Sequence, residues 1–201
     1  MLEFKNVSVS LSAQRQSTPF SLEMDTGQVA FISGPAQSGK TLLLLAVLGL
    51  VPLATGYITI DGELLTPGSA AYFRRMVAYV PQQMPTDRIK VIRLFRSLLC
   101  LNATSVETDP QHVLCALEKR WQDIGLPPEL ASQWVPDVDP ATLRTAMLAA
   151  VPLLRRPIVL VDDPMPDDLT TRLLQHLAAD GAEVLCASRS HDPLCHKTIT
   201  L

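Results

Sequence analysis

The chain lacks the excess of positive charge that proteins binding nucleic acid carry. Its 17 Lys and Arg residues are outnumbered by 20 Asp and Glu residues, so the formal net charge is −3. Binding to a nucleic-acid backbone calls for a basic stripe or patch on one face. The composition therefore gives no reason to expect nucleic acid as a partner.

Long apolar runs and an export signal are also missing. The longest apolar run covers only residues 42–51, whereas a membrane span needs about 20 residues. Residues 1–20 are mixed and polar, unlike the apolar core of a signal peptide. We therefore expect residues 42–51 to form a buried helix.

Paired cysteines are a third absence. The four cysteines, Cys100, Cys115, Cys186 and Cys195, show no C-x-x-C spacing. Without an export signal, such thiols are expected to be reduced core residues rather than disulfides. His191, Cys195 and His196 lie close in the sequence but lack a fourth ligand nearby, so no metal site of this type is predicted.

What the chain does contain is a phosphate-binding loop. Residues 34–41 fit the pattern G-x-x-x-x-G-K-[ST] at every specified position. They follow an apolar strand expected at 29–33 and precede the apolar helix, whose N-terminus favours an anion. Lys40 is expected to reach the β- and γ-phosphates of a nucleotide, and the Thr41 hydroxyl to bind Mg²⁺. The predicted phosphate-binding residues are Gly34, Pro35, Ala36, Gln37, Ser38, Gly39, Lys40 and Thr41.

The order of elements predicts an α/β fold in a single domain, for which 201 residues with 47% hydrophobic content suffice. Residues 2–11 and 20–24 alternate as half-buried strands, and further strands are expected at 57–60 and 76–80. Residues 158–162 form a continuous apolar strand that ends in Asp162 and Asp163, as in a central parallel strand. A helix at 169–179 and a strand at 183–188 follow. Apolar residues recur at helical spacing between about 84 and 150, which indicates a helical insert between core segments 1–83 and 151–201.

Four segments together resemble the nucleotide-binding domain of ABC (ATP-binding cassette) transporters over essentially the whole chain. They are the phosphate loop at 34–41, the Tyr-Val-Pro-Gln segment at 79–82, the strand at 158–162 and the turn phrase at 57–62. The resemblance implies a P-loop NTPase of the ABC type, with a mostly parallel core sheet, an N-terminal antiparallel β subdomain and a helical subdomain. It also implies ATP and Mg²⁺ as cofactors.

The same resemblance assigns roles to individual residues. Gln82 takes the place of the glutamine that lies near Mg²⁺ and the attacking water, and Asp162 that of the carboxylate that holds Mg²⁺. Asp163 takes the place of the catalytic glutamate but is one methylene shorter. Because a general base must reach its proton within hydrogen-bond distance, we expect slow hydrolysis. We assign the family's switch histidine to His191, which matches by its Asp192 neighbour; the alternative is Arg189, which matches by distance from the last core strand.

Two further segments depart from the family. The signature motif, normally Leu-Ser-Gly-Gly-Gln, is replaced by Asp-Pro-Ala-Thr-Leu at 139–143. Asp139 and Pro140 make a good helix start, yet they place a carboxylate where a partner's γ-phosphate should bind. The aromatic ring that stacks on adenine is also missing, because Val9 and Leu11 lie in its region, and its loss costs about 1 kcal/mol.

Three functions remain open from the sequence. The first is the ATP-binding subunit of an ABC transporter, peripheral on the cytoplasmic face of the cell membrane. It would form a homodimer, or a heterodimer with another cassette, and act on a separate integral membrane permease. The second is a degenerate subunit that binds nucleotide with little or no hydrolysis and acts as a regulatory or structural partner. The third is a soluble P-loop kinase, which the scattered arginines between 84 and 150 disfavour.

Overall fold

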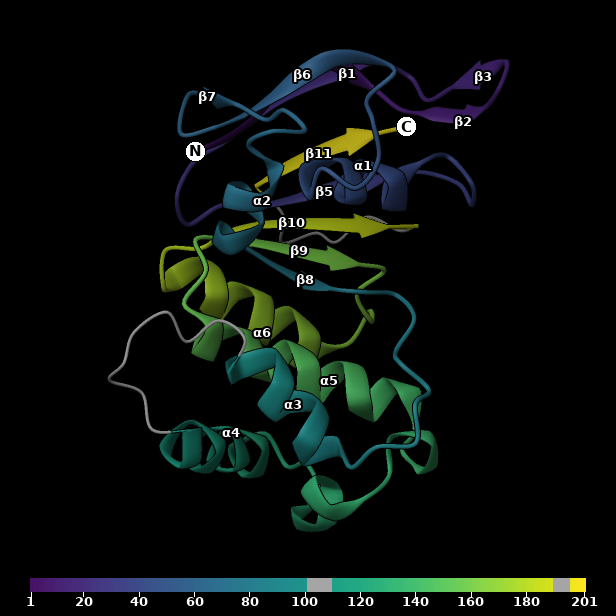
Figure 1. Ribbon diagram of the computed structural model, residues 1–201. Helices are drawn as coiled ribbons and strands as arrows, with labels where there is room; N and C mark the ends of the chain where they lie inside the picture. Colours follow the sequence, from purple (N-terminus) through teal and green to yellow (C-terminus); the bar gives the residue numbers. More distant parts are fainter. Residues whose placement is uncertain (101–109, 190–195) are drawn as a thin grey trace. The chain divides into compact units, whose positions relative to one another are not determined.

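The structure, a computed structural model, describes residues 1–100, 110–189 and 196–201 (Figure 1). The chain falls into two units. The first contains Met1–Gln82, Arg156–Pro166 and Leu174–Leu201, and the second contains Gln83–Arg155 and Asp167–Leu173. Each unit has its own buried core of apolar side chains.

A five-stranded parallel sheet forms the centre of the first unit, with strand order β11-β5-β10-β9-β8. Every residue of β5, β9 and β10 is buried. Strands covered on both faces need continuous apolar sequence, which explains why the sequence runs at these positions do not alternate. The strands are β5 (Val29–Ser33), β8 (Val77–Val80), β9 (Ile158–Asp162), β10 (Glu183–Ser188) and β11 (Lys197–Thr200).

A second sheet of the first unit is antiparallel, with strand order β4-β1-β6-β7. Helix α1 (Lys40–Val47) shares one apolar core with both sheets and lies between them (Figure 1). These two sheets and the helices confirm the predicted α/β class, with a parallel core sheet and an N-terminal antiparallel part. The strands are β1 (Leu2–Ser8), β4 (Phe20–Met24), β6 (Thr55–Ile60) and β7 (Glu63–Leu64), and the short helices nearby are α2 (Ala70–Phe73) and the 3₁₀ helix η1 (Arg74–Met76).

The first predicted strand, residues 2–11, is two strands in the structure. Strand β1 ends at Ser8, and a separate hairpin follows, formed by β2 (Ser10–Ser12) and β3 (Arg15–Gln16). The pairing of β1 with both of its neighbours shifts register just before this point. Such irregularities bend a strand and end its pairing, so the chain after Ser8 leaves the sheet.

Three long helices build the second unit around a core of their own. The Phe95 and Trp121 rings meet edge to face at 4.9 Å between centroids. The indole N–H of Trp121 donates to the Ala146 carbonyl oxygen at 3.1 Å, which satisfies its one buried polar group. The elements are α3 (Val91–Cys100), α4 (Pro110–Asp123), α5 (Pro140–Ala150) and the 3₁₀ helices η2 (Pro128–Ser132), η3 (Val135–Asp137) and η4 (Val151–Leu154). Helix α6 (Asp168–Ala179) has residues in both units.

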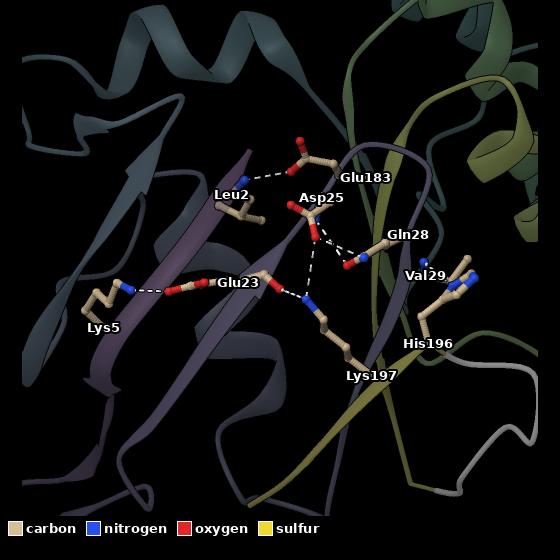
Figure 2. Close-up of polar contacts among 9 residues, drawn as sticks. All are labelled: Leu2, Lys5, Glu23, Asp25, Gln28, Val29, Glu183, His196 and Lys197. Carbon is tan, nitrogen blue, oxygen red and sulfur yellow. Dashed lines mark hydrogen bonds and ion pairs between the residues drawn. The ribbon is translucent and has the colours of Figure 1, made fainter.

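Polar side chains at the N-terminal ends of the parallel strands bond these ends to neighbouring strands, as Figure 2 shows. The Lys197 ammonium donates to the Glu23 carbonyl oxygen, and His196 Nδ1 accepts the Val29 N–H at 3.0 Å. The buried Glu183 carboxylate accepts the Leu2 N–H at 2.7 Å. These bonds join β11 to β4 and β5, and β10 to β1.

The cysteine prediction is only partly right. Cys186 is buried in β10, but Cys115 is exposed on α4, so the expectation of a core residue is wrong there. Helix α4 turns one side to solvent, and Cys115 lies on that side between the exposed Gln111 and Glu118. Nothing is described of the Cys100 side chain, and Cys195 lies outside the described residues. Within the described ranges, no helix is long and apolar enough to cross a bilayer.

Gly56 is expected to be indispensable to the antiparallel sheet. Its φ is +73°, and a Cβ there would lie 2.2 Å from the Lys5 carbonyl oxygen and 2.3 Å from that of Asn6. Because both obstacles are backbone atoms, the variant Gly56→Ala should lower the free energy of unfolding by about 2 kcal/mol or more. Chemical denaturation measures the loss.

The matched control for this prediction is Gly68→Ala. The nearest atom to a Cβ at Gly68 is the Thr66 hydroxyl oxygen at 3.8 Å, an ordinary contact. This variant should change the free energy of unfolding by less than about 0.5 kcal/mol. Equal losses for the two variants would show that the close approach at Gly56 is not a constraint on folding.

Candidate nucleotide-binding site

The register of the parallel sheet brings the phosphate loop and the acidic strand end together. Strand β10 pairs with β5 on one side and with β9 on the other, so that Ser188 aligns with Ser33 and Ala187 with Asp162. Open α/β sheets bind ligands at the carboxyl ends of their strands. At this edge lies a cavity of about 650 Å³, lined by the phosphate loop, by residues that follow β8, β9 and β10, and by the β2–β3 hairpin.

The phosphate loop has the backbone conformation that a close turn requires. Gly39 has a φ of +99°, and a Cβ there would lie 2.8 Å from Leu11 Cδ2 and 2.9 Å from Val9 Cγ2. Only glycine adopts this positive φ and leaves room for the two neighbouring side chains without strain. The chain can therefore pass close under these side chains and begin α1 at Lys40, with the N-terminal N–H groups of the helix at the loop.

The Lys40 ammonium lies over this loop. It donates to the carbonyl oxygens of Gly34 at 2.9 Å and Pro35 at 2.7 Å, and to the Ser38 hydroxyl at 3.3 Å. Burial, and secondarily the positive charge of Arg189, lower the pKa of Lys40. A bound polyphosphate would raise the pKa of Lys40 again, because its negative charge favours the protonated amine.

A hydroxyl and a carboxylate meet at the other side of the loop. Thr41 Oγ1 donates to Asp162 Oδ2 at 2.8 Å, and the Asp162 carboxylate is buried. The Tyr79 hydroxyl approaches the same oxygen at 3.5 Å. Burial first, then the charge of Asp162, raise the pKa of Tyr79 to about 12, so this phenol stays neutral at physiological pH. Thr41 and Asp162 offer hard oxygen ligands of the kind that Mg²⁺ takes, and the donor set therefore fits this ion.

Asp163 makes a different contact from its neighbour. Its φ is +54°, which turns the chain away from the strand direction, and its N–H donates to the Ala187 carbonyl oxygen at 2.7 Å. The Gln82 side-chain amide donates to Asp163 Oδ2 at 2.9 Å. Aspartate tolerates the left-handed region better than most residues, so this position combines an acid with a sharp turn.

The structure thus brings most of the predicted site residues to one cavity. Residues 36–41, Gln82, Asp162 and Asp163 all line it. His191 lies outside the described residues. Arg189, the alternative for the switch position, does line the cavity.

The sequence did not predict the part of the cavity wall that the β2–β3 hairpin supplies. Ser12 and Arg15 enter from the β2–β3 hairpin, whose strands are short and polar. Leu11, from the region in which the stacking ring was sought, accompanies them. The alternation of residues 2–11 was the available signal, but it predicted one long strand and not a hairpin.

The start of α5 in the second unit is as predicted. Asp139 is the N-cap and its carboxylate accepts the Thr142 backbone N–H at 3.0 Å, with Pro140 at the first helical position. The Thr142 hydroxyl donates to the same carboxylate at 3.3 Å. Two donors of this turn that could otherwise bind a ligand, the N–H and the hydroxyl of Thr142, are therefore already bonded to Asp139.

A phosphate loop at a helix N-terminus, with its lysine, and a threonine bonded to a strand-end aspartate define a P-loop nucleotide-binding site. Comparison with known proteins narrows the class further. The family described as ABC transporter matches residues 18–166. The chain therefore belongs to the ABC transporter family, and it contains the ATP-binding domain of that family.

Curated relatives agree with this assignment. The manganese transport system ATP-binding protein MntB of Listeria innocua is 38% identical over 78 residues, which cover 39% of this chain and 30% of the relative. The phosphonates import ATP-binding protein PhnC of Hyphomonas neptunium is 27% identical over 185 residues, or 86% of this chain and 71% of the relative. The match to MntB thus spans less than a third of that relative's length.

A solved structure shows the same fold. The ATP-binding cassette MJ0796, in a dimeric post-hydrolysis state bound to ADP and Pi, superposes with a TM-score of 0.80 at 21% identity. The match covers 100% of this chain and 94% of that one. This likeness confirms the predicted ABC ATPase type of fold.

Proposed function

We propose that this chain is the ATP-binding subunit of an ABC transporter that couples the binding and slow hydrolysis of Mg·ATP to transport by a separate permease. The observation that carries the proposal is the bond between Thr41 and Asp162 beside Lys40, in the cavity that also holds Gln82 and Asp163. The family assignment leaves the soluble kinase without support.

The chain's own residues divide the chemistry among them. The phosphate loop and Lys40 bind the phosphates. Thr41, Asp162 and Gln82 are the residues that would hold Mg²⁺, which would supply positive charge beside the transferred phosphoryl group. Asp163 is the general base and removes the proton from the attacking water. Its short side chain limits its reach, which is why hydrolysis is slow.

The signature region is degenerate in this proposal. Asp139 already accepts hydrogen bonds from the Thr142 N–H and hydroxyl, and it places a negative charge at the N-terminus of α5. Pro140 has no N–H to offer. A surface of this kind binds a partner's γ-phosphate poorly, so the dimer contains at least one weak composite site. Pairing with a cassette whose signature is intact would leave one competent site.

Membership of the family supports a proposal for the partner and the location. Residues 1–201 act as one cassette, with core segments 1–83 and 151–201 and a helical subdomain at about 84–150. The cassette forms a homodimer or a heterodimer and docks on an integral membrane permease at the cytoplasmic face of the cell membrane.

The degenerate signature and the aspartate at position 163 favour one alternative, a subunit that binds nucleotide without turning it over. Two measurements separate the two functions. Calorimetry with Mg·ATP measures nucleotide binding, and phosphate release in the presence of the permease and the partner cassette measures hydrolysis. Binding with slow phosphate release supports the leading proposal. Binding with phosphate release at background supports the alternative, and no binding at saturating Mg·ATP contradicts both.

Arg189 is expected to bind the terminal phosphate in the place of the switch histidine. It directly follows β10, with the phosphate loop on one side and Asp162 and Asp163 on the other. Arg189→Ala should weaken Mg·ATP binding about tenfold or more and Mg·ADP binding much less, because only ATP has the γ-phosphate. His191→Ala is the comparison variant, and a larger loss there would transfer the role to His191.

A further inference from the structure

The cavity has one end that the phosphates and the metal do not account for. The residues assigned to phosphate, metal and base chemistry come from the phosphate loop and from the ends of β8, β9 and β10. The remaining wall comes from the β2–β3 hairpin, which contributes Leu11, Ser12 and Arg15. A nucleoside triphosphate whose phosphates fill the loop must place its base against some other part of the cavity.

Contacts at the phosphate loop show that the part of the cavity wall formed by the β2–β3 hairpin begins next to Gly39. Leu11 Cδ2 and Val9 Cγ2 lie within 3 Å of the position that a Cβ on Gly39 would take. The Ser17 hydroxyl accepts the Val9 N–H at 3.1 Å, and the Ser17 N–H donates to the Val9 carbonyl oxygen at 2.9 Å, which closes the hairpin at its base. The aliphatic surface of Leu11 therefore borders the phosphate loop directly, and Arg15 lies beyond it on the paired strand.

Arg15 is available for a ligand. Its side chain is exposed, and among the described residues no hydrogen bond, ion pair or ring contact engages its guanidinium. None of the described residues that line the cavity is aromatic. A guanidinium is planar, and it stacks on aromatic faces through cation–π and π contacts that do not depend on the hydrogen-bonding edge of the ring.

We propose that Arg15 is the nucleobase-binding residue of this site and that its guanidinium stacks on the base beside Leu11. The inference rests on the proposed nucleotide-binding function. Because every base has a π face, the site takes purine and pyrimidine nucleoside triphosphates with similar affinity. Its selectivity lies in the phosphates and not in the base.

Calorimetric titration of the full chain tests this with five ligands, each with Mg²⁺: ATP, GTP, CTP, UTP and inorganic tripolyphosphate, which has no base. The four nucleotides should bind within about threefold of one another and about three- to tenfold more tightly than tripolyphosphate. Arg15→Ala should remove this advantage and leave tripolyphosphate binding unchanged. Arg15→Lys should do the same, because lysine keeps the charge but lacks the plane.

Arg75→Ala is the matched control, since Arg75 is exposed in η1 and does not line the cavity. It should leave the affinity for all five ligands unchanged. Equal weakening of ATP and tripolyphosphate by Arg15→Ala would make Arg15 a phosphate ligand and overturn the proposal. Unchanged binding of ATP would overturn it too, and so would a preference of more than tenfold for one base. If no ligand bound to the parent chain, the proposed function itself would fail, and this inference with it.

Discussion

Replacement of Lys40 by alanine is expected to weaken Mg·ATP binding by at least about a hundredfold, or about 3 kcal/mol. The ammonium is partly buried and lies near Arg189, a second positive charge that also lines the cavity. A bound triphosphate would supply the compensating negative charge, and its charge-assisted bonds to Lys40 would be among the strongest available to the site. Calorimetric titration of the variant and the parent with Mg·ATP measures the loss.

Lys119→Ala is the control, because Lys119 is exposed on α4 in the second unit. It should bind Mg·ATP as the parent does. Lys40→Ala should also keep its fold, since the bonds it loses are to the edge of a surface loop, and circular dichroism can verify this. Parental affinity in a folded Lys40→Ala variant would refute the phosphate-binding role of residues 34–41 and the proposed function with it.

The parts of the fold that could be predicted from the sequence are those with a strong local signal. The bounds of β5 and β10, Val29–Ser33 and Glu183–Ser188, are the predicted ones. Each is a continuous apolar run, and Gly34 or Arg189 directly follows it. A fully buried strand admits no polar side chain along most of its length, so its ends are visible in the sequence itself.

Strand β11 and the β2–β3 hairpin could not be predicted in this way. Residues 197–200 form a short and mixed segment that joins the parallel sheet by pairing with β5, far away in the chain. The bond from Lys197 to the Glu23 carbonyl oxygen ties the same segment to β4 (Figure 2). The hairpin follows a register shift in the pairing of β1 with both of its neighbouring strands, β4 and β6. In both cases the deciding contacts are tertiary, and local propensity does not contain them.

The pair Asp162 and Asp163 shows the same limit within the site. The sequence places two acids at one strand end, and their different roles came only from the family resemblance. In the structure, the strand direction takes Asp162 to Thr41, whereas the left-handed conformation of Asp163 takes its carboxylate to Gln82. A single change of backbone φ thus gives two adjacent acids different partners.

That separation leads to the second large effect. Asp163→Asn should lower ATP hydrolysis by about a hundredfold or more, because an amide cannot accept the proton of the attacking water. Mg·ATP affinity should stay within about threefold of the parent. Asparagine tolerates the left-handed region as aspartate does, and its Oδ1 can still accept the Gln82 amide, so the variant changes the charge and leaves the geometry. Phosphate release, measured beside the permease and the partner cassette, gives the rate.

Asp162→Asn is the matched comparison, one residue away on the same strand end. It removes the charge bonded to Thr41, so it should weaken nucleotide binding in the presence of Mg²⁺ and leave binding in EDTA nearly unchanged. Opposite signatures are therefore expected from neighbouring substitutions: Asp163→Asn retains binding and loses turnover, and Asp162→Asn loses the advantage that Mg²⁺ confers. If Asp163→Asn hydrolysed ATP at the parental rate, Asp163 would not be the base. If both variants behaved alike, the separation of the two acids by the turn at Asp163 would have no functional consequence.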